Sequence, residues 1–205
     1  MVKDLIKIQE HIAKKVSLKN GFSKIKTIAG FDVAYLGEKA KVCGVVLDYR
    51  NLEIKEIVTH KFMAEFPYIP TFLSFREGPP IIEVYKMFKI KPDVLMIDGH
   101  GIAHPRNAGL ASYIGVLLNK PTIGVAKSRL IGEYKEPKKP FSATKLMLGK
   151  NQIGWVLKSG KNYKPIFISP GHKISFRSSL KITMRCIKDE KLPEPIRIAD
   201  FYANK

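Results

Sequence analysis

The sequence predicts an α/β protein built on one mixed sheet with helices on both faces. Three β-rich stretches joined by short links follow an N-terminal helical pattern, which indicates an antiparallel three-strand meander. Helical and buried-strand patterns then alternate, which is typical of parallel strands connected by helices. No repeat, linker or low-complexity segment interrupts the 205 residues, so we expect a single domain, 1–205.

The first half of the chain supplies a helix, the meander and a second helix. Apolar residues recur on one face of residues 2–16, which predicts an amphipathic helix. The three strands of the meander are predicted at Lys26–Tyr35, Lys41–Tyr49 and Glu53–Lys61. An irregular stretch rich in aromatic residues and proline runs from Ala64 to Gly78. Pro79 and Pro80 suit a first helical turn, so a short helix is predicted to begin there.

The second half alternates strands and helices. Continuous apolar runs at Val94–Ile97 and Pro121–Ala126 predict buried parallel strands, with a helix at Ala108–Leu118 between them. A loop rich in lysine and proline follows at Glu133–Pro140. The remaining predicted elements are two strands, Gln152–Lys158 and Pro165–Ser169, a helix at about Phe176–Lys188 and a last helix from near Pro195.

The charge of the chain points to a polyanionic partner. Lys and Arg number 36 against 18 Asp and Glu, a formal net charge of +18. Such an excess favours nucleic acid, because basic side chains that neutralise phosphates release counterions. The two cysteines, Cys43 and Cys186, lie outside any zinc or disulfide pattern. No apolar run approaches a membrane span, so we expect a soluble, cytoplasmic monomer with no membrane partner.

Three acidic residues stand in contexts that suggest a metal site. Asp98 directly follows a buried strand, at the sheet edge where α/β proteins bind ligands. Asp32 lies within the first strand, where Asp is disfavoured, and Glu77 precedes the predicted helix. Together they offer the oxygen ligands that Mg²⁺ prefers, and such an ion serves phosphodiester hydrolysis. Taken singly, each has a simpler reading: a helix cap, an edge residue facing water, or an acid at a helix dipole.

Basic residues surround the same predicted edge. Lys127 follows the second buried strand and could hold a phosphate or position the attacking water. His172, placed just past the last strand, could contact phosphate, transfer a proton or cap a helix. His100 and His104 flank the Asp98 loop and could help to bind phosphate.

The segment Phe66-Pro67-Tyr68-Ile69-Pro70 is a candidate wedge. Two prolines stiffen the loop, and a rigid apolar projection can unstack bases so that one is extruded. The alternative is a hydrophobic loop folded over the core; the nearness of Glu77 in the sequence favours the wedge.

In this order, the motifs closely resemble those of the endonuclease V family, from about Phe22 to Asp200. Their combination is specific, although none suffices alone. The matching segments are Ala29–Tyr35, Pro67-Tyr68-Ile69-Pro70 with Phe75-Arg76-Glu77, Asp98-Gly99-His100-Gly101 with Ala103-His104-Pro105-Arg106, Thr122–Ser128 and Ser169-Pro170-Gly171-His172.

The resemblance implies a ribonuclease H-like fold in which the first strand lies beside the strand that carries Asp98. It further implies a DNA repair endonuclease that recognises hypoxanthine, the base of inosine. Such an enzyme cuts the second phosphodiester bond 3′ to the lesion and leaves a 3′-hydroxyl and a 5′-phosphate. The implied cofactor is Mg²⁺, which Mn²⁺ can replace, and the partner is inosine-containing DNA, with RNA as a further target.

The resemblance also implies roles for individual residues. Asp32, Asp98 and Glu77 would bind the metal, and Lys127 and His172 would act around the scissile phosphate. Tyr68 would be the wedge, and Thr71 stands where many members carry Gly, so its branched side chain is expected to narrow the pocket rim. The DNA-binding set is Tyr68, Pro67, Ile69, Pro70, Leu73, Gly99, His104 and Gly109, of which Leu73, Gly99 and Gly109 would surround the flipped base.

Two other functions remain open from the sequence. One is a different ribonuclease H-like nuclease, directed at junctions or RNA–DNA hybrids; the wedge loop argues against it. The other is a non-catalytic nucleic-acid-binding module, which would be expected to have lost at least one acid. All three acids are present.

Overall fold

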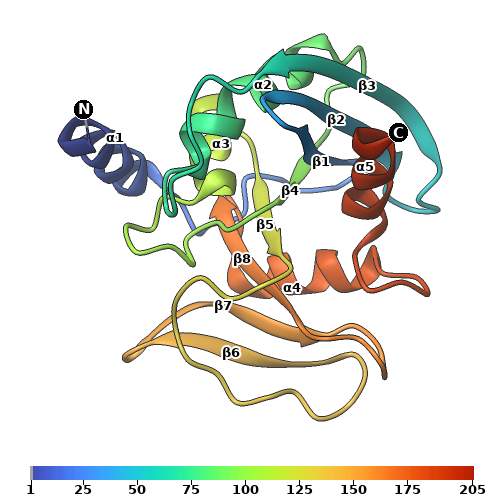
Figure 1. Ribbon diagram of the computed structural model, residues 1–205. Helices are drawn as coiled ribbons and strands as arrows, with labels where there is room; N and C mark the ends of the chain where they lie inside the picture. The colour runs from blue at the N-terminus through green and yellow to red at the C-terminus, as the bar shows by residue number, and fades with distance from the viewer. Residues whose placement is uncertain (1) are drawn as a thin grey trace.

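The computed structural model describes residues 2–205 and contains one eight-stranded sheet with the strand order β3-β2-β1-β4-β5-β8-β7-β6. The predicted mixed sheet with helices on both faces is confirmed. Figure 1 shows the meander and the β6–β7 hairpin at opposite sides of this sheet. The strands are β1 (Thr27–Leu36), β2 (Lys39–Asp48), β3 (Ile54–Met63), β4 (Val94–Asp98), β5 (Thr122–Ala126), β6 (Ser142–Leu148), β7 (Asn151–Lys158) and β8 (Ile166–His172).

The meander and the parallel centre form as the sequence predicts. β1 pairs with β2, and β2 with β3, in antiparallel fashion. β4 lies parallel to β1, and β5 lies parallel to β4. Because β1, β4 and β5 run in one direction, their carboxyl ends meet at one edge of the sheet.

The last three strands differ from the prediction. β8 runs antiparallel to β5, and β7 and β6 continue this antiparallel arrangement. β6 was not predicted, so the expectation of only two strands here is wrong. Its sequence has a single fully buried apolar side chain, Leu146, and the strand exists because β7 pairs with it at the sheet margin. Gly149, at φ +57°, forms the tight turn between the two strands.

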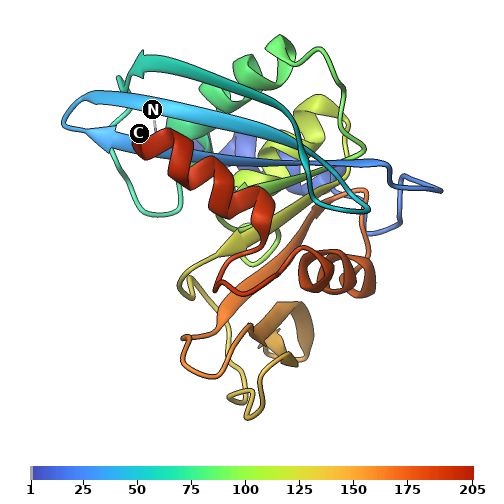
Figure 2. The same cartoon turned by 90° about the vertical axis from the view of Figure 1, so that its right-hand side faces the viewer.

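Helices cover both faces of the sheet. On one face, α2 (Leu73–Met87) and α3 (Leu110–Leu118) enclose a core that includes Phe31, Val46 and Ile97, and α1 (Val2–Lys15) packs against α3. On the other face, α4 (Phe176–Arg185) and α5 (Glu194–Asn204) cover a second core. Figure 2 shows α5, in red, lying across the meander strands. Among the described residues, no helix combines the length and apolar character needed to cross a bilayer.

The helix predicted to start at Pro79 begins at Leu73 instead. Tertiary packing explains the difference. The ring of Phe75 packs against Phe66, Phe72 and Tyr113, and a side chain at Gly78 would strike Tyr113. These contacts stabilise a helical turn ahead of the two prolines, and they draw Glu77 into the helix.

Alternation along β1 decides which residues face which helix layer. Phe31 points to the α2 side, where its ring meets Phe88. Gly30 points to the α5 side, where an added Cβ would lie 2.0 Å from the carbonyl oxygen of Pro195. Asp32 is two residues beyond Gly30 and therefore shares the α5 side.

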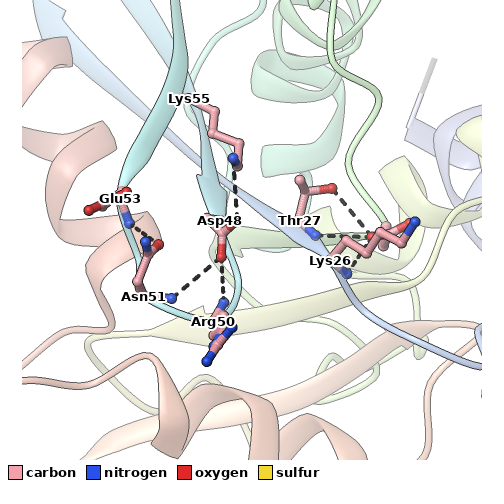
Figure 3. Close-up of polar contacts among 8 residues, drawn as sticks. Lys26, Thr27, Asp48, Arg50, Asn51, Glu53 and Lys55 are labelled. Atoms are coloured by element: carbon pink, nitrogen blue, oxygen red, sulfur yellow. Dashed lines mark hydrogen bonds and ion pairs between the residues drawn. The ribbon is translucent and has the colours of Figure 1, made fainter.

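The amino ends of β1 and β4 form the opposite edge of the sheet. Here Asp48 accepts hydrogen bonds from the backbone N–H of Arg50 at 2.8 Å and of Asn51 at 3.4 Å, and pairs with Lys55 (Figure 3). Asp93 accepts from the backbone N–H of Lys26 at 2.8 Å and of Thr27 at 3.0 Å. Both carboxylates therefore close turns and connect strands.

Candidate active site

Asp32 and Asp98 lie side by side at the carboxyl edge of the sheet. Phe31 pairs with Ile97 in the parallel β1–β4 register, so the next residue of each strand, Asp32 and Asp98, are neighbours on the α5 side. The parallel pairing thus brings together two acids that are 66 positions apart in the sequence.

Lys127 and Asp200 complete a cluster with these two acids. Lys127 follows β5, and its Nζ lies 2.8 Å from Asp98 Oδ2 and 3.3 Å from Asp200 Oδ1. Asp200 belongs to α5 and also shares a side-chain hydrogen bond with Asp32. Asp200 was not among the site residues predicted from the sequence. The available signal was an acid in the second half of a helix, where the helix dipole disfavours negative charge.

Crowding of these carboxylates changes their protonation. Burial, the Asp98 charge and the hydrogen bond to Asp200 raise the pKa of Asp32 to about 8. Partial burial lowers the pKa of the Lys127 ammonium group. The three carboxylates around it outweigh this effect and raise the pKa overall; they are those of Asp98, Asp32 and Asp200. The cluster therefore has excess negative charge that one lysine only partly compensates.

The donor chemistry of the cluster fits a hard divalent cation. Asp32, Asp98 and Asp200 supply carboxylate oxygens, and the Lys127 ammonium group already occupies a cation position between two of them. Among residues 2–205, however, no three His, Cys, Asp or Glu side chains are already arranged to hold an ion. Carboxylate rotamers and the Lys127 amine would therefore have to shift for an ion to bind.

Glu77 approaches the cluster from the other side of the sheet. It is buried in α2, and its Oε1 accepts a hydrogen bond from the Tyr35 hydroxyl at 3.0 Å. Burial raises the pKa of Glu77 to about 7, and the Asp98 charge adds to the increase. Glu77 is therefore within electrostatic reach of Asp98, whereas Asp200 is the acid that contacts Asp32 and Lys127.

His172 does not lie near this cluster, and its role at the scissile phosphate stays a prediction. It is the last residue of β8, not a residue beyond the strand, and it pairs with Thr122 at the start of β5. Because β8 runs antiparallel to β5, His172 is about 16 Å along the strand direction from Lys127. Its Nδ1 accepts a hydrogen bond from the backbone N–H of Ser17.

A cavity of about 280 Å³ adjoins the cluster at the ends of β4 and β5. Asp98 and Lys127 contribute to its wall. Of the residues predicted to contact DNA, those that line the cavity are Tyr68, Pro70, Leu73, Gly99, His104 and Gly109. Pro67 and Ile69 belong to the same loop.

Two glycines allow the backbone to pack closely in the wall of this cavity. Gly99 has φ +149°, which side chains rarely adopt, and a Cβ at Gly109 would lie 2.4 Å from the His100 carbonyl oxygen. Tyr68 at the cavity mouth is 68% exposed, unusually high for a tyrosine in a folded protein. The loop therefore presents an aromatic ring to solvent beside a concave site.

Thr71 anchors the Tyr68 loop and adopts φ +71°, an unfavourable conformation for a β-branched residue. Its hydroxyl accepts a hydrogen bond from Arg106 at 2.7 Å, and its carbonyl accepts from buried Gln9 of α1 at 2.7 Å. Thr71 lines the cavity, and its hydroxyl is committed to Arg106; the expected narrowing of the rim stays a prediction. Side-chain hydrogen bonds thus hold a backbone that glycine would adopt freely.

His100 and His104 lie beside the cavity in buried positions that disfavour their charged forms. Burial lowers the pKa of each to about 4. His100 Nε2 lies 3.1 Å from the Ser128 carbonyl oxygen, and His104 Nε2 lies 2.9 Å from that of Thr71. Both rings therefore hold loops around the cavity and carry no charge at neutral pH.

Comparison with known proteins identifies relatives along nearly the whole chain. The family model described as Endonuclease V matches residues 10–201. An Endonuclease V from Dictyoglomus turgidum is 42% identical over 203 residues, which cover 98% of this chain and 89% of the relative. The crystal structure of a Bacillus subtilis endonuclease V superposes with a TM-score of 0.94 at 33% identity, covering 100% of this chain and 91% of that one.

One structural relative contains nucleic acid. Ciona intestinalis endonuclease V, in complex with a 24-residue DNA that contains an inosine followed by a ribo-adenosine, superposes with a TM-score of 0.90 at 32% identity. The match covers 99% of this chain and 96% of that one. By its sequence and its fold, the chain belongs to the endonuclease V family.

Proposed function

We propose that this protein is a metal-dependent DNA repair endonuclease that recognises hypoxanthine. It hydrolyses the second phosphodiester bond 3′ to the lesion and leaves a 3′-hydroxyl and a 5′-phosphate. The observation that carries this proposal is the pair Asp32 and Asp98 on neighbouring strands, with a base-sized cavity directly beside them. We further propose that residues 1–205 act as one catalytic domain and as a monomer.

Asp32 and Asp98 are the proposed ligands of Mg²⁺, with Mn²⁺ able to replace it. When bound, the ion would activate water and neutralise charge on the scissile phosphate. Asp200 would hold or orient the same ion, because it already contacts Asp32 and Lys127. Lys127 would turn from the carboxylates towards the phosphate as the ion takes over their charge.

Glu77 would complete the site from the α2 side. Its hydrogen bond with Tyr35 fixes its orientation, and Tyr35 is itself held by the Arg76 guanidinium, 4.4 Å above its ring. At neutral pH the raised pKa of Glu77 leaves it partly protonated. It can therefore exchange a proton with water near Asp98.

The cavity would receive the flipped base and Tyr68 would fill the space that the base leaves. At about 280 Å³, the cavity falls at the small end of ligand pockets, which span ~300–1,000 Å³, and this size suits one flat base. Leu73 and the backbone at Gly99 and Gly109 would contact the base. Hydrogen bonds from fixed backbone groups would distinguish hypoxanthine from adenine.

The direct test uses strand-labelled DNA and RNA of one sequence, each with a single inosine, incubated with and without Mg²⁺. We expect a metal-dependent nick in DNA at the second bond 3′ to inosine, and no nick in the matched adenosine strand. Cleavage of an RNA–DNA hybrid without regard to inosine would favour a different nuclease. Binding without turnover in Mg²⁺ and Mn²⁺ would indicate a non-catalytic module.

Tyr68→Ala tests the wedge. The variant should lose about tenfold in preference for inosine over adenosine strands, because stacking on an aromatic ring contributes ~1–3 kcal/mol per base. Single-turnover cleavage of both strands measures this preference. Tyr163→Ala, which changes a tyrosine outside the cavity lining, is the matched control. Equal preference in Tyr68→Ala and the parent protein would exclude the wedge role.

A further inference from the structure

A second concave surface lies at the same edge of the sheet as the acidic cluster. It has a volume of about 820 Å³ and is bounded by the ends of β1–β3 and by the C-terminal turn of α5. We call it the meander groove. The side chains on the α5 side of this groove include Lys39, Lys41, Lys61 and Met63, and Lys205 lies at its α5 end.

The floor of the meander groove continues from the acidic cluster. Ala34 and Leu36 alternate with Asp32 on β1, so they share its side of the sheet. Lys41 pairs with Ala34, and Lys61 pairs with Lys41, so both lysines lie on that side as well. The groove therefore begins at Ala34, the next residue after Asp32 on the same face of β1.

Three lysines of the groove, Lys39, Lys41 and Lys61, lack an acidic partner among the described residues. Lys41 and Lys61 stand directly opposite each other on neighbouring strands, an arrangement in which like charges are destabilising. No Asp or Glu lines the groove, and within residues 2–205 neither these two lysines nor Lys39 makes an ion pair. Phosphate groups would supply the missing negative charge.

Apolar surface accompanies these charges. Leu36 is 83% exposed and Met63 is 53% exposed, and both lie on the face that carries the lysines. Lysines interleaved with exposed apolar side chains suit a polynucleotide strand, which offers both phosphates and apolar base faces.

The order of the strands gives the groove a direction. The base-sized cavity lies at the ends of β4 and β5, the acidic pair at β1 and β4, and the meander groove at β1, β2 and β3. A strand that enters from the cavity and passes the acidic pair arrives at the groove. Given the proposed function, in which the cut is 3′ to the lesion, we propose that the meander groove binds the DNA strand on the 3′ side of the cut.

The test compares Lys39→Gln/Lys61→Gln with the parent protein on two inosine substrates. Lys41 stays in place because it is closer to Asp32. One substrate extends about ten nucleotides beyond the cut, and the other ends one nucleotide after it. With EDTA present to prevent cleavage, the double variant should bind the long substrate about tenfold more weakly, and its salt dependence should fall by about two phosphate contacts. On the short substrate the loss should shrink to less than about twofold.

A matched variant controls for net charge. Lys86→Gln/Lys89→Gln removes the same charge at the other end of α2, away from this edge, and should lose less than about twofold on the long substrate. The proposal is overturned if the groove variant loses the same binding affinity on both substrates, or loses no more affinity than the control variant. The proposed function is judged separately, because the parent protein either nicks inosine DNA or does not.

Discussion

Aspartates stand at both edges of the sheet, and the two edges use them in opposite ways. At the amino edge, Asp48 and Asp93 accept hydrogen bonds from backbone N–H groups, and those bonds lower the pKa of Asp48. At the carboxyl edge, Asp32 is crowded by Asp98 and Asp200, and burial with these neighbours raises its pKa to about 8.

The difference separates aspartates that stabilise the fold from those available for chemistry. A carboxylate that accepts backbone hydrogen bonds lowers the free energy of the folded state. Carboxylates that repel one another raise it, and a bound cation would relieve the repulsion. Such a cost is expected at functional sites and not at turns. The predictions below test this division.

The largest expected effect is on catalysis at the carboxyl edge. Asp98→Asn should lower metal-dependent nicking by about a thousandfold or more, because it removes a proposed metal ligand; residues that only support ligands typically cost ~10–100-fold. Single-turnover cleavage of inosine DNA measures the rate. Binding of the same DNA in EDTA checks that the variant folds. Nicking at the parent rate would remove Asp98 from the active site.

Asp200→Asn should have the next largest effect. Asp200 contacts Asp32 and Lys127 from α5, so its loss should lower nicking by about 10- to 100-fold. A rise in the Mg²⁺ concentration needed for half-maximal rate would distinguish a role at the metal from a role in folding. Asp189→Asn, outside the cluster, is the matched control. An unchanged Mg²⁺ requirement and rate would make the Asp200 contacts incidental.

At the amino edge the effect should be on stability alone. Asp93→Ala removes the acceptor for two backbone N–H groups, and hydrogen bonds to charged groups contribute ~1.5–3 kcal/mol. We therefore expect the free energy of unfolding to fall by about 2 kcal/mol, measured in urea, with the nicking rate unchanged below the melting temperature. A loss of activity in the folded variant would break the division between the two edges.

The smallest expected effects are on the stability of the fold, and they change with pH in opposite directions for Asp32 and Asp48. The raised pKa of Asp32 means that the folded protein keeps a proton that the unfolded chain releases, so metal-free stability is lost as pH rises from about 4 to about 8. Asp32→Asn should therefore gain stability over the parent across that window. The lowered pKa of Asp48 stabilises the fold fully above its unfolded pKa, so the advantage of the parent over Asp48→Asn should decline below that value and be lost as pH falls through the lower pKa of the folded state.

Melting temperatures of the three metal-free proteins between pH 3 and 9 would test these signs. Parallel curves for both variants would show that the two edges do not differ electrostatically.

Much of the fold could be predicted because local patterns decide it. Alternation defined the meander, and apolar runs defined β4 and β5 to within a residue or two. β6 escaped prediction because its own sequence has only one fully buried apolar side chain, so the strand depends on its pairing with β7. The first turn and a half of α2 escaped prediction because it packs against Tyr113, which is distant in the sequence.

The sequence by itself determined that Asp32 would lie within a strand and that Asp98 would end one, because hydrophobic periodicity is a local property. It also determined that Tyr68 would project from a stiff loop, because proline restricts the backbone locally. Only the tertiary structure decided which distant groups join them. The direction of β8 carried His172 to the far edge, and the packing of α5 across the meander brought Asp200 to Asp32. Strand direction and helix docking depend on how whole surfaces pack, and no short segment of the sequence contains that information.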